Sequence, residues 1–342
     1  METATLILIG IMIAPTITDE KATDVDSPRP PTGCPVSGVG RSYPKLDGVM
    51  AQFVDKLNCS AGALAVSKEG RLLYARGYGW LDLEHSRPAP ANVLIGIASC
   101  EKSITASAVR ILAGKHKLKL DEPFFKTLDI QPRDTVEDPR VKSITVLNVL
   151  DHKSGWGSDI HDHLVKLAEA SGMKPPWTMP ILLRQVMGLR LEADPGKVFN
   201  YSNFGYDALR YLLEVKSGET PGSFFREKLL KKKSQDVGQP GEAATEEVIG
   251  RRVWNVNDGG PVYASASYLT EFMREYWMSG QPRTGNGQVW VMYGSLDGST
   301  ALMLWRGDGL NVAALFNGRN ETTHDAIKTA LEQALVEERL AK

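Results

Sequence analysis

The sequence is poor in cysteine: 342 residues contain three, Cys34, Cys59 and Cys100. Three scattered thiols cannot build a disulfide framework, and no Cys-x-x-Cys pair offers a structural zinc site. One disulfide between Cys34 and Cys59 and a pair of free thiols both remain open. The cysteine content therefore excludes a small, disulfide-stabilised scaffold.

A net charge of either sign is also absent. Forty basic residues face forty-one acidic ones, which leaves a formal charge of −1. This balance gives no electrostatic footprint for nucleic acid or for an anionic membrane surface. We therefore expect no nucleic-acid partner. With 42% hydrophobic and 24% charged residues, the chain has an average globular composition and can bury a sizeable core.

Long hydrophobic runs are missing beyond the first fifteen residues, so nothing there reaches the roughly 18–20 apolar residues of a membrane-spanning helix. Leu6–Ala14 has the length of the apolar part of a secretory leader, although Glu2 precedes it. Pro15–Lys45 is rich in Asp, Pro, Thr, Gly and Ser, as flexible linkers are. We expect residues 1–45 to be a leader plus linker. The protein would then be periplasmic or secreted, and otherwise cytoplasmic, and we expect no stable membrane insertion of the mature chain.

Strand patterns occur near both ends of the chain, and helical patterns dominate the middle. Helical spacing over Leu46–Leu57 precedes a hairpin around Gly70. The other expected elements are strands at Ala61–Ser67, Leu72–Tyr78, Thr300–Trp305 and Val312–Phe316, helical segments around Ile104–Leu112 and Tyr201–Val215, and a final helix from about Thr322 to Leu340.

The pattern predicts an α/β (α+β) fold, in which both chain ends form one antiparallel sheet flanked by helices, with a mostly helical insertion. We expect one folded domain over residues 46–342. Its sheet part would comprise about 46–98 and 275–342, and its helical part about 99–274.

The segment Ile97–Thr105 contains a Ser-x-x-Lys motif, Ser99 and Lys102, at the start of a helical pattern. A helix places residues three apart on one face, so the amine can lie beside the hydroxyl. A neighbouring amine whose pKa is lowered by burial can take the serine proton and create a nucleophile. Alone, the motif also fits a helix-capping serine beside a surface lysine.

A second motif, Tyr201-x-Asn203, follows a Pro-Gly turn and immediately precedes another helical pattern. A tyrosine phenol can shuttle protons next to a cation, and an asparagine amide can bind a substrate carbonyl. Together, the two motifs favour a nucleophilic enzyme over a capping serine.

The combination of Ser-x-x-Lys and Tyr-x-Asn resembles the serine β-lactamase and penicillin-binding-protein family, in particular the branch of class C β-lactamases, D,D-peptidases and esterases. Lys142–Gly155 resembles the family's Ile-Thr-x-x-x-Leu-Leu-x-His-x-Ser-Gly stretch, and Gly77-Tyr78-Gly79 resembles the end of its second strand. The likeness extends from Leu46 to the C-terminus. It implies a β-lactamase/transpeptidase-like catalytic domain. In such a domain Ser99 would be the acylated nucleophile and Lys102 its proton acceptor. Tyr201 would be the general acid and base, and Asn203 would supply a substrate-positioning amide.

The sequence departs from this family at Met292-Tyr293-Gly294-Ser295, where members usually carry Lys-Thr-Gly or His-x-Gly. The resemblance makes Gly294 and Ser295 substrate-binding residues, with the backbone N–H groups of Ser99 and Ser295 as the oxyanion hole. Met292 replaces the basic or imidazole group, and no histidine lies between Gln281 and Asn317. Losing a polar group there argues against β-lactam or D-Ala-D-Ala recognition and favours neutral esters. Whether Met292 lowers activity stays open.

Three other interpretations have weaker support: a metal site, an α/β-hydrolase and a cysteine nucleophile. His161-Asp162-His163, with His152 upstream, lacks the further Asp-His of a binuclear metal hydrolase, so we predict no metal ligands. No Gly-x-Ser-x-Gly motif is present, which disfavours an α/β-hydrolase. Cys100 has no nearby histidine to activate it and is expected to be a small buried helix residue. We interpret His152 as a brace for the helix beside it.

The sequence therefore predicts a serine hydrolase or acyl-transferase that works through an acyl-enzyme and needs no cofactor. Its partner would be a small-molecule ester, amide or peptide substrate, with an esterase favoured over a β-lactamase or D,D-peptidase. The alternative is a catalytically weak fold of the same family that acts as a binding or regulatory protein. No pattern indicates an oligomeric state.

Overall fold

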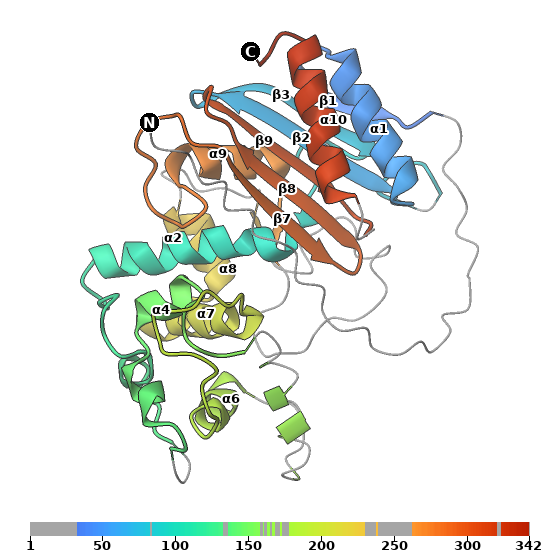
Figure 1. Cartoon of the computed structure of the whole chain (residues 1–342). Helices are drawn as coiled ribbons and strands as arrows, with labels where there is room; N and C mark the ends of the chain where they lie inside the picture. The colour runs from blue at the N-terminus through green and yellow to red at the C-terminus, as the bar shows by residue number, and fades with distance from the viewer. Residues whose placement is uncertain are drawn as a thin grey trace.

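A computed structural model gives the fold of the chain (Figure 1). It describes residues 33–82, 84–132, 136–157, 160, 163–164, 166–167, 172, 178–229, 237–238, 262–319 and 323–341. The predicted leader and the pair His161-Asp162 lie outside these residues.

One antiparallel sheet unites the two ends of the chain, as predicted. Its strand order is β1-β3-β2-β9-β8-β7. The central pair β2 and β9 runs from Gly62 opposite Phe316 to Lys68 opposite Leu310. The strands are β1 (Val36–Gly40), β2 (Ala61–Lys68), β3 (Arg71–Gly79), β7 (Trp290–Leu296), β8 (Ser299–Trp305) and β9 (Leu310–Phe316).

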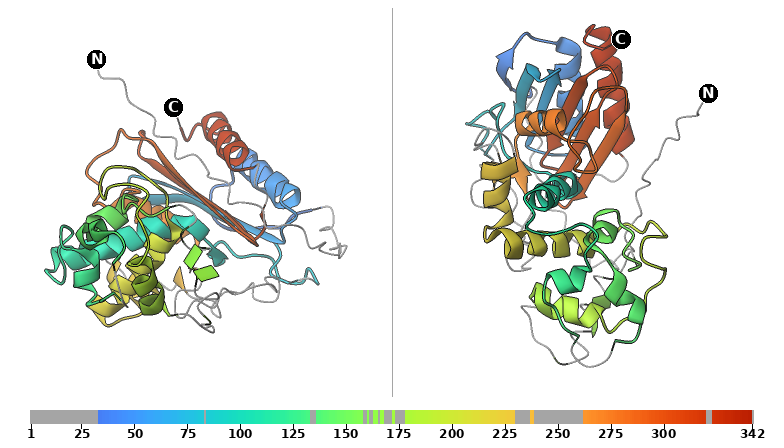
Figure 2. Two further views of the ribbon diagram at one scale, coloured as in Figure 1. Left: turned by 60° about the horizontal axis from the view of Figure 1, so that its bottom comes forward. Right: turned by 90° about the vertical axis from the view of Figure 1, so that its left-hand side faces the viewer.

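Helices cover both faces of this sheet (Figures 1 and 2). The terminal helices α1 (Pro44–Lys56) and α10 (His324–Glu337) lie together on one face, where they bury an apolar cluster against the strands. Helix α9 (Ala266–Glu275) contacts the other face through apolar side chains such as Phe272. The predicted boundary placed residues 266–274 in the helical part. In the structure, the apolar face of α9 packs on the large sheet instead.

The predicted linker Pro15–Lys45 is wrong at its C-terminal end. Val36–Gly40 forms the edge strand β1, which pairs antiparallel with β3 from Val36 opposite Tyr78 to Gly40 opposite Tyr74. Gly38 has a φ of 136°, a value that glycine adopts readily. The strand is short and contains two glycines, so its composition does not predict a strand. The free backbone edge of β3 supplies the pairing that local propensity does not.

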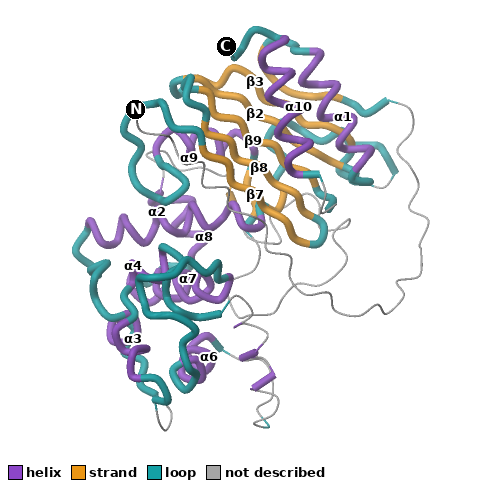
Figure 3. Tube along the Cα trace, in the orientation of Figure 1, coloured by secondary structure: helices purple, strands orange, loops and turns teal. Residues whose placement is uncertain are grey.

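The middle of the chain is mostly helical, as expected (Figure 3). It also contains a small sheet, which the sequence did not predict, of the two-residue strands β4 (Ile95–Gly96), β5 (Val237–Gly238) and β6 (Tyr263–Ala264). The helices are the 3-10 helix η1 (Ala98–Cys100), α2 (Glu101–Gly114), α3 (Phe124–Thr127), the 3-10 helix η2 (Pro139–Ser143), α4 (Val146–Leu150), α6 (Met179–Val186), α7 (Asn203–Ser217), α8 (Pro221–Phe224) and the π-helix η3 (Phe225–Leu229).

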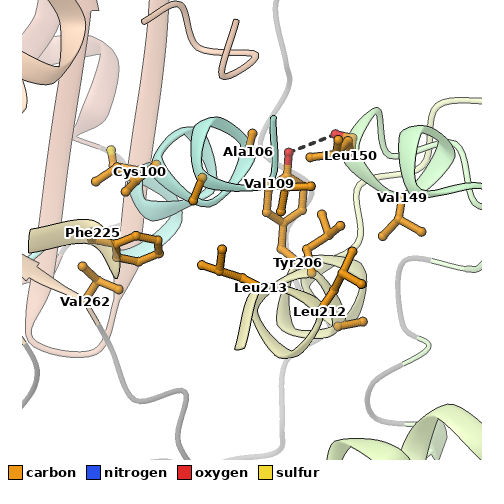
Figure 4. Packing of buried hydrophobic residues seen from close by; sticks show 14 of the residues in the cluster. Cys100, Ala106, Val109, Val149, Leu150, Tyr206, Leu212, Leu213, Phe225 and Val262 are labelled. Carbon is orange, nitrogen blue, oxygen red and sulfur yellow. Dashed lines mark hydrogen bonds between the residues drawn. The ribbon is translucent and has the colours of Figure 1, made fainter. Parts of the chain in front are cut away.

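Helix α2 lies between the large sheet and the group of helices that includes α4, α6 and α7, and nearly its whole circumference is buried. Val109 on α2 and Leu213 on α7 belong to the core that joins these two helices (Figure 4). The hydroxyl of Tyr206 donates to the backbone oxygen of Leu150 at the end of α4, at 2.9 Å. Such close packing on several sides holds the N-terminal turn of α2 firmly in place.

All three cysteines are free thiols, so the Cys34–Cys59 disulfide that the sequence left open is not formed. Cys59 and Cys100 are buried, and Cys34 is half-buried. Burial raises the pKa of the Cys59 thiol to about 12, which disfavours the reactive thiolate. Among the residues that the structure describes, no helix has the length and apolar character to cross a membrane.

Candidate active site

Ser99 lies in the 3-10 turn η1, directly before α2. Strand β4 ends at Gly96, and the backbone N–H of Ile97 then donates to Val262 at 3.0 Å, which fixes the chain as it enters the turn. Ala98 has a φ of 45°, in the left-handed region that non-glycine residues seldom occupy. A strained residue beside a half-buried serine hydroxyl is a feature of functional turns.

Lys102 lies on the same face of the turn as Ser99, as the motif spacing predicts. Its Nζ is 3.3 Å from Ser99 Oγ, and its side chain is almost completely buried, with an exposed fraction of 6%. The ammonium also lies 5.1 Å from the ring centre of Tyr201 and 5.8 Å from that of Tyr206. The lysine is therefore an inward-facing charge between two aromatic rings, not a surface residue.

Tyr201 reaches the same hydroxyl from a distant part of the sequence. Its phenol donates to Ser99 Oγ at 2.9 Å. Asn203, two residues later, is the exposed first residue of α7, and within the described chain it makes no hydrogen bond to Ser99, Lys102 or Tyr201. The structure thus brings together the hydroxyl, the amine and the phenol, while the role of Asn203 stays a prediction.

His152 holds the backbone on both sides of Tyr201. Its carbonyl accepts the N–H of Asn200 at 2.7 Å, and its Nδ1 accepts the N–H of Ser202 at 3.0 Å. The imidazole stacks on the Tyr201 ring with 4.6 Å between ring centres. Sequence reasoning treated His152 as a brace for a helix. In the structure it braces the segment that carries Tyr201 instead.

Burial and the nearby Lys102 charge lower the pKa of His152 to about 3. The ring is therefore neutral at neutral pH, and its unprotonated Nδ1 can accept the hydrogen bond from Ser202. A positive φ of 55° at His152 turns the chain sharply after α4 and directs the ring toward Tyr201.

The charge state of Lys102 differs from the sequence-based expectation. Burial alone disfavours its ammonium form, but the opposing charges of Tyr201 and Glu101 outweigh burial and raise its pKa above the ordinary value. This direction is opposite to the lowered pKa that the sequence reasoning invoked, while the role of Lys102 as proton acceptor stays a prediction. Glu101 is itself buried and accepts a hydrogen bond from Thr105 at 2.8 Å. Its position inside the Ser-x-x-Lys motif, next to Lys102 in the same helix, is the sequence signal for this charge.

The other side of the site is β7, the edge strand of the large sheet. A side chain at Gly294 would overlap the carbonyl oxygen of Ile97 and lie 3.2 Å from the Cβ of Ala98. In the same 3-10 turn, the thiol of Cys100 lies 3.6 Å from the carbonyl oxygen of Met292. These contacts hold the Ser99 turn against β7 and give a steric reason for glycine at 294, while the predicted substrate-binding role of Gly294 and Ser295 stays a prediction.

Side chains alternate along β7, and those on the catalytic side of the strand are apolar. Met292 packs half-buried against the core on the side of α2. Leu296 has the same orientation by alternation and is 45% exposed. Phe199, two residues before Tyr201, is 48% exposed and contacts the His152 ring. The surroundings of the site therefore offer apolar surface where the resemblance implied a cation or an imidazole.

Metal-binding side chains do not gather in the described part of the chain: no group there contains three or more His, Cys, Asp or Glu residues placed to hold an ion. His152 Nδ1 is already occupied by the backbone of Ser202. His161 and Asp162 lie outside the described residues, and His163 is exposed.

Comparison with known proteins places this geometry in context. A class C β-lactamase structure superposes on 86% of this chain and 95% of its own, with a TM-score of 0.65 and 15% sequence identity. Esterase EstB from Burkholderia gladioli is 27% identical over 183 residues, 51% of this chain and 45% of EstB. Protein flp from Staphylococcus aureus (strain COL) is 26% identical over 174 residues, 51% of this chain and 33% of flp. The chain thus spans less than half the length of these curated relatives.

The Beta-lactamase family itself matches residues 46–274, which include Ser99, Lys102, Tyr201 and Asn203. The structural likeness, at low sequence identity, supports the same β-lactamase/transpeptidase fold. The chain therefore belongs to the Beta-lactamase family of serine hydrolases, whose fold is shared by β-lactamases, penicillin-binding-protein homologues, esterases and amidases.

Proposed function

We propose that this protein is a serine hydrolase that cleaves small neutral esters through an acyl-enzyme on Ser99. The observation that carries the proposal is the convergence on one oxygen: Ser99 Oγ lies 2.9 Å from the Tyr201 phenol and 3.3 Å from Lys102 Nζ. A buried amine and a phenol, both within reach of a serine hydroxyl, are the parts that nucleophilic catalysis requires.

The charge on Lys102 decides which group accepts the proton. Since the pKa of Lys102 is raised, its ammonium persists at neutral pH and acts as a fixed positive charge. We therefore assign proton transfer to the Tyr201 oxygen, the nearer of the two groups; for this step Tyr201 must first release to solvent the proton that it donates to Ser99 in the resting site. The ammonium stabilises negative charge on that oxygen and on Ser99. This assignment revises the role of proton acceptor that the sequence gave to Lys102.

The reaction then has two balanced halves. Ser99 Oγ attacks the ester carbonyl, its proton passes to the Tyr201 oxygen, and Tyr201 returns this proton to the departing alkoxide. In the second half, Tyr201 takes a proton from water, the resulting hydroxide attacks the acyl carbon, and the proton returns to Ser99 Oγ. His152 keeps Tyr201 in line for both transfers through the backbone of its two neighbours.

The oxyanion formed in both halves would be held by the backbone N–H groups of Ser99 and Ser295. Close contact between the Ser99 turn and Gly294 supports this assignment, because it sets the two donors on adjoining elements. The donors belong to the backbone, so the change to Met292 leaves them intact.

Apolar surroundings support a neutral substrate. Met292, Leu296 and Phe199 supply hydrophobic contact area but no cation for a substrate carboxylate. The name of the relative EstB agrees with an esterase, although the match covers only 51% of this chain. β-Lactams and D-Ala-D-Ala peptides carry a carboxylate, so we expect them to be poor substrates.

The proposal is tested by labelling with a fluorescent fluorophosphonate, which phosphonylates activated serines, and by turnover of a p-nitrophenyl ester series. We expect the unaltered protein to label and to hydrolyse short neutral esters faster than a chromogenic cephalosporin or a D-Ala-D-Ala peptide. Ser99→Ala should abolish both signals, whereas Ser103→Ala, one helical turn away on α2, should retain them.

Absence of labelling and turnover in a folded preparation would instead support a binding or regulatory protein. Labelling that survives in Ser99→Ala would contradict the assignment of the nucleophile. Preferential turnover of the cephalosporin would leave the serine mechanism in place but overturn the preference for neutral esters.

A further inference from the structure

A second buried histidine lies on the opposite face of β7. His324 is the first residue of α10 and has an exposed fraction of only 4%. Its Nε2 is 3.3 Å from the carbonyl oxygen of Gly294. His324 thus reaches, from the α10 side of the sheet, the same glycine at which an added Cβ would overlap the Ser99 turn.

The hydrogen bond fixes the tautomer of this imidazole. A carbonyl oxygen can only accept, so Nε2 must carry the hydrogen and donate it. Nδ1 is buried and has no hydrogen-bond partner among the residues that the structure describes. Burial also lowers the pKa of His324, which favours a neutral ring with an unprotonated Nδ1. The bond to Gly294 is therefore the ring's one polar contact in the described chain.

Neighbouring side chains hold the ring in this orientation. The ring of Tyr293 packs on His324 with 5.0 Å between ring centres. The Tyr293 hydroxyl donates to Asp325 at 2.8 Å, which ties β7 to the first turn of α10. His324 is therefore held close to the strand by a second contact that does not involve Gly294.

The Gly294 carbonyl and the Ser295 N–H belong to one peptide group. A trans peptide is planar, and its C=O and N–H point in opposite directions. Any contact that fixes the direction of the Gly294 oxygen therefore also fixes the direction of the Ser295 hydrogen. In the proposed function, that hydrogen is one of the two donors of the oxyanion hole.

We propose that His324 is a positioning residue that orients and polarises the Gly294–Ser295 peptide, so that the Ser295 N–H is preorganised for the oxyanion. This inference rests on the proposed function, because it requires the oxyanion hole at Ser99 and Ser295. A donor on the carbonyl oxygen strengthens the N–H of the same peptide as a hydrogen-bond donor. The benefit is greatest when negative charge develops on the substrate, so it lowers the transition state more than the ground state.

The test compares two replacements of similar size. In His324→Gln, the side-chain amide nitrogen can occupy the place of Nε2 and donate to Gly294. In His324→Leu the ring volume is largely kept, but the donor is lost. With a p-nitrophenyl ester, we expect His324→Leu to lower kcat about 10-fold with KM within about 2-fold, and His324→Gln to recover most of kcat.

A boronic acid that forms a tetrahedral adduct on Ser99 provides a second measurement, since the adduct oxygen occupies the oxyanion hole. Its affinity should fall with His324→Leu by the same factor as kcat and recover with His324→Gln. Ile327→Val, which trims a buried side chain on the same helix, controls for loss of stability and should leave both values unchanged. If His324→Leu does not fold, His324→Asn, whose shorter amide falls short of Gly294, replaces it in the comparison with His324→Gln.

Unchanged kcat and boronate affinity in His324→Leu would overturn the inference, as would a loss that His324→Gln does not restore. A loss that Ile327→Val reproduces would assign the effect to stability and also overturn it. These outcomes are separate from failure of the proposed function, in which the unaltered protein itself shows neither turnover nor Ser99 labelling.

Discussion

The two sides of the candidate active site use different parts of the chain. The helical side contributes side chains, namely Ser99, Lys102 and Tyr201, which meet at one oxygen. The strand side contributes β7, whose proposed role at Gly294 and Ser295 depends on its backbone. A single substitution removes a catalytic side chain, whereas a backbone N–H donor is kept when the side chains around it are replaced. The comparison explains how Met292 can stand where a cation is usual while the rest of the site is intact.

Each side is also supported by a buried histidine that does not touch Ser99. His152 accepts the N–H of Ser202 and stacks on Tyr201. His324 donates to the carbonyl of Gly294. Both rings are kept neutral by burial, and each fixes a short stretch of backbone. Buried hydrogen bonds of this kind position catalytic groups more firmly than loop packing alone.

The largest effects should come from the helical side. Tyr201→Phe and Lys102→Ala should each lower kcat for an ester substrate at least about 10²-fold, because the first removes the proton carrier and the second removes the charge that stabilises it. Steady-state kinetics measure both. Near-normal rates in these two variants would contradict the division of labour between the two sides.

Tyr206→Phe is the matched control for Tyr201→Phe. Tyr206 also packs against Lys102, but its hydroxyl bonds to Leu150 and not to Ser99. We expect some loss of stability from the unpaired carbonyl and little change in kcat.

A smaller effect is expected on the strand side from Gly294→Ala. The added methyl group would overlap the Ile97 oxygen, so β7 or the Ser99 turn must shift and the proposed oxyanion hole should open. We expect kcat to fall about 50-fold, below the cost of losing Tyr201. Gly48→Ala, where a Cβ meets no atom within 4 Å, should leave kcat unchanged. Equal kcat in both variants would argue against a backbone role for β7.

Met292→Lys tests whether the strand side lacks only a cation, because it places an ammonium group on β7 where related proteins usually carry a basic residue. A new ammonium would attract a substrate carboxylate, so we expect KM for an anionic p-nitrophenyl hemiester to fall about 10-fold relative to the neutral acetate. Met292→Leu is an apolar replacement of similar volume and should leave this ratio as it is. An unchanged ratio in Met292→Lys would show that residue 292 does not face the substrate.

The remaining effect is on stability and not on kcat, and it comes from the titration of His152. Its pKa is about 3 in the folded protein and about 6.5 when unfolded, so the unfolded chain binds more protons between these values. The associated stability is therefore complete above about pH 6.5 and is lost as the pH falls toward 3, by at most about 1.4 kcal/mol per pH unit. Denaturant titrations between pH 7 and 4 measure this slope.

His152→Asn removes the titrating ring, keeps an acceptor for Ser202 and tolerates the positive φ at this position. We expect a flatter pH dependence of stability in this variant. An identical slope would show that other groups account for the acid sensitivity.

Much of the fold follows from local patterns. The strands at Ala61–Lys68 and Leu310–Phe316, and the terminal helices, were predicted within a few residues because their apolar spacing is strong. Strand β1 and helix α9 were misassigned for a common reason. A glycine-containing edge strand and a helix packed on a distant sheet depend on partners far away in the sequence, which no local window contains.

By itself, the sequence determined which reactive groups this protein has: the spacing of Ser99 and Lys102 and the segment around Tyr201 were enough to predict their meeting. Only the tertiary structure decided how those groups are charged and supported. Burial lowers the pKa of Lys102, and the nearby charges of Tyr201 and Glu101 outweigh burial and raise it. The contact of His324 with Gly294 depends on how α10 packs on the sheet. Desolvation and hydrogen-bond direction are set by three-dimensional neighbours, and a linear pattern carries neither.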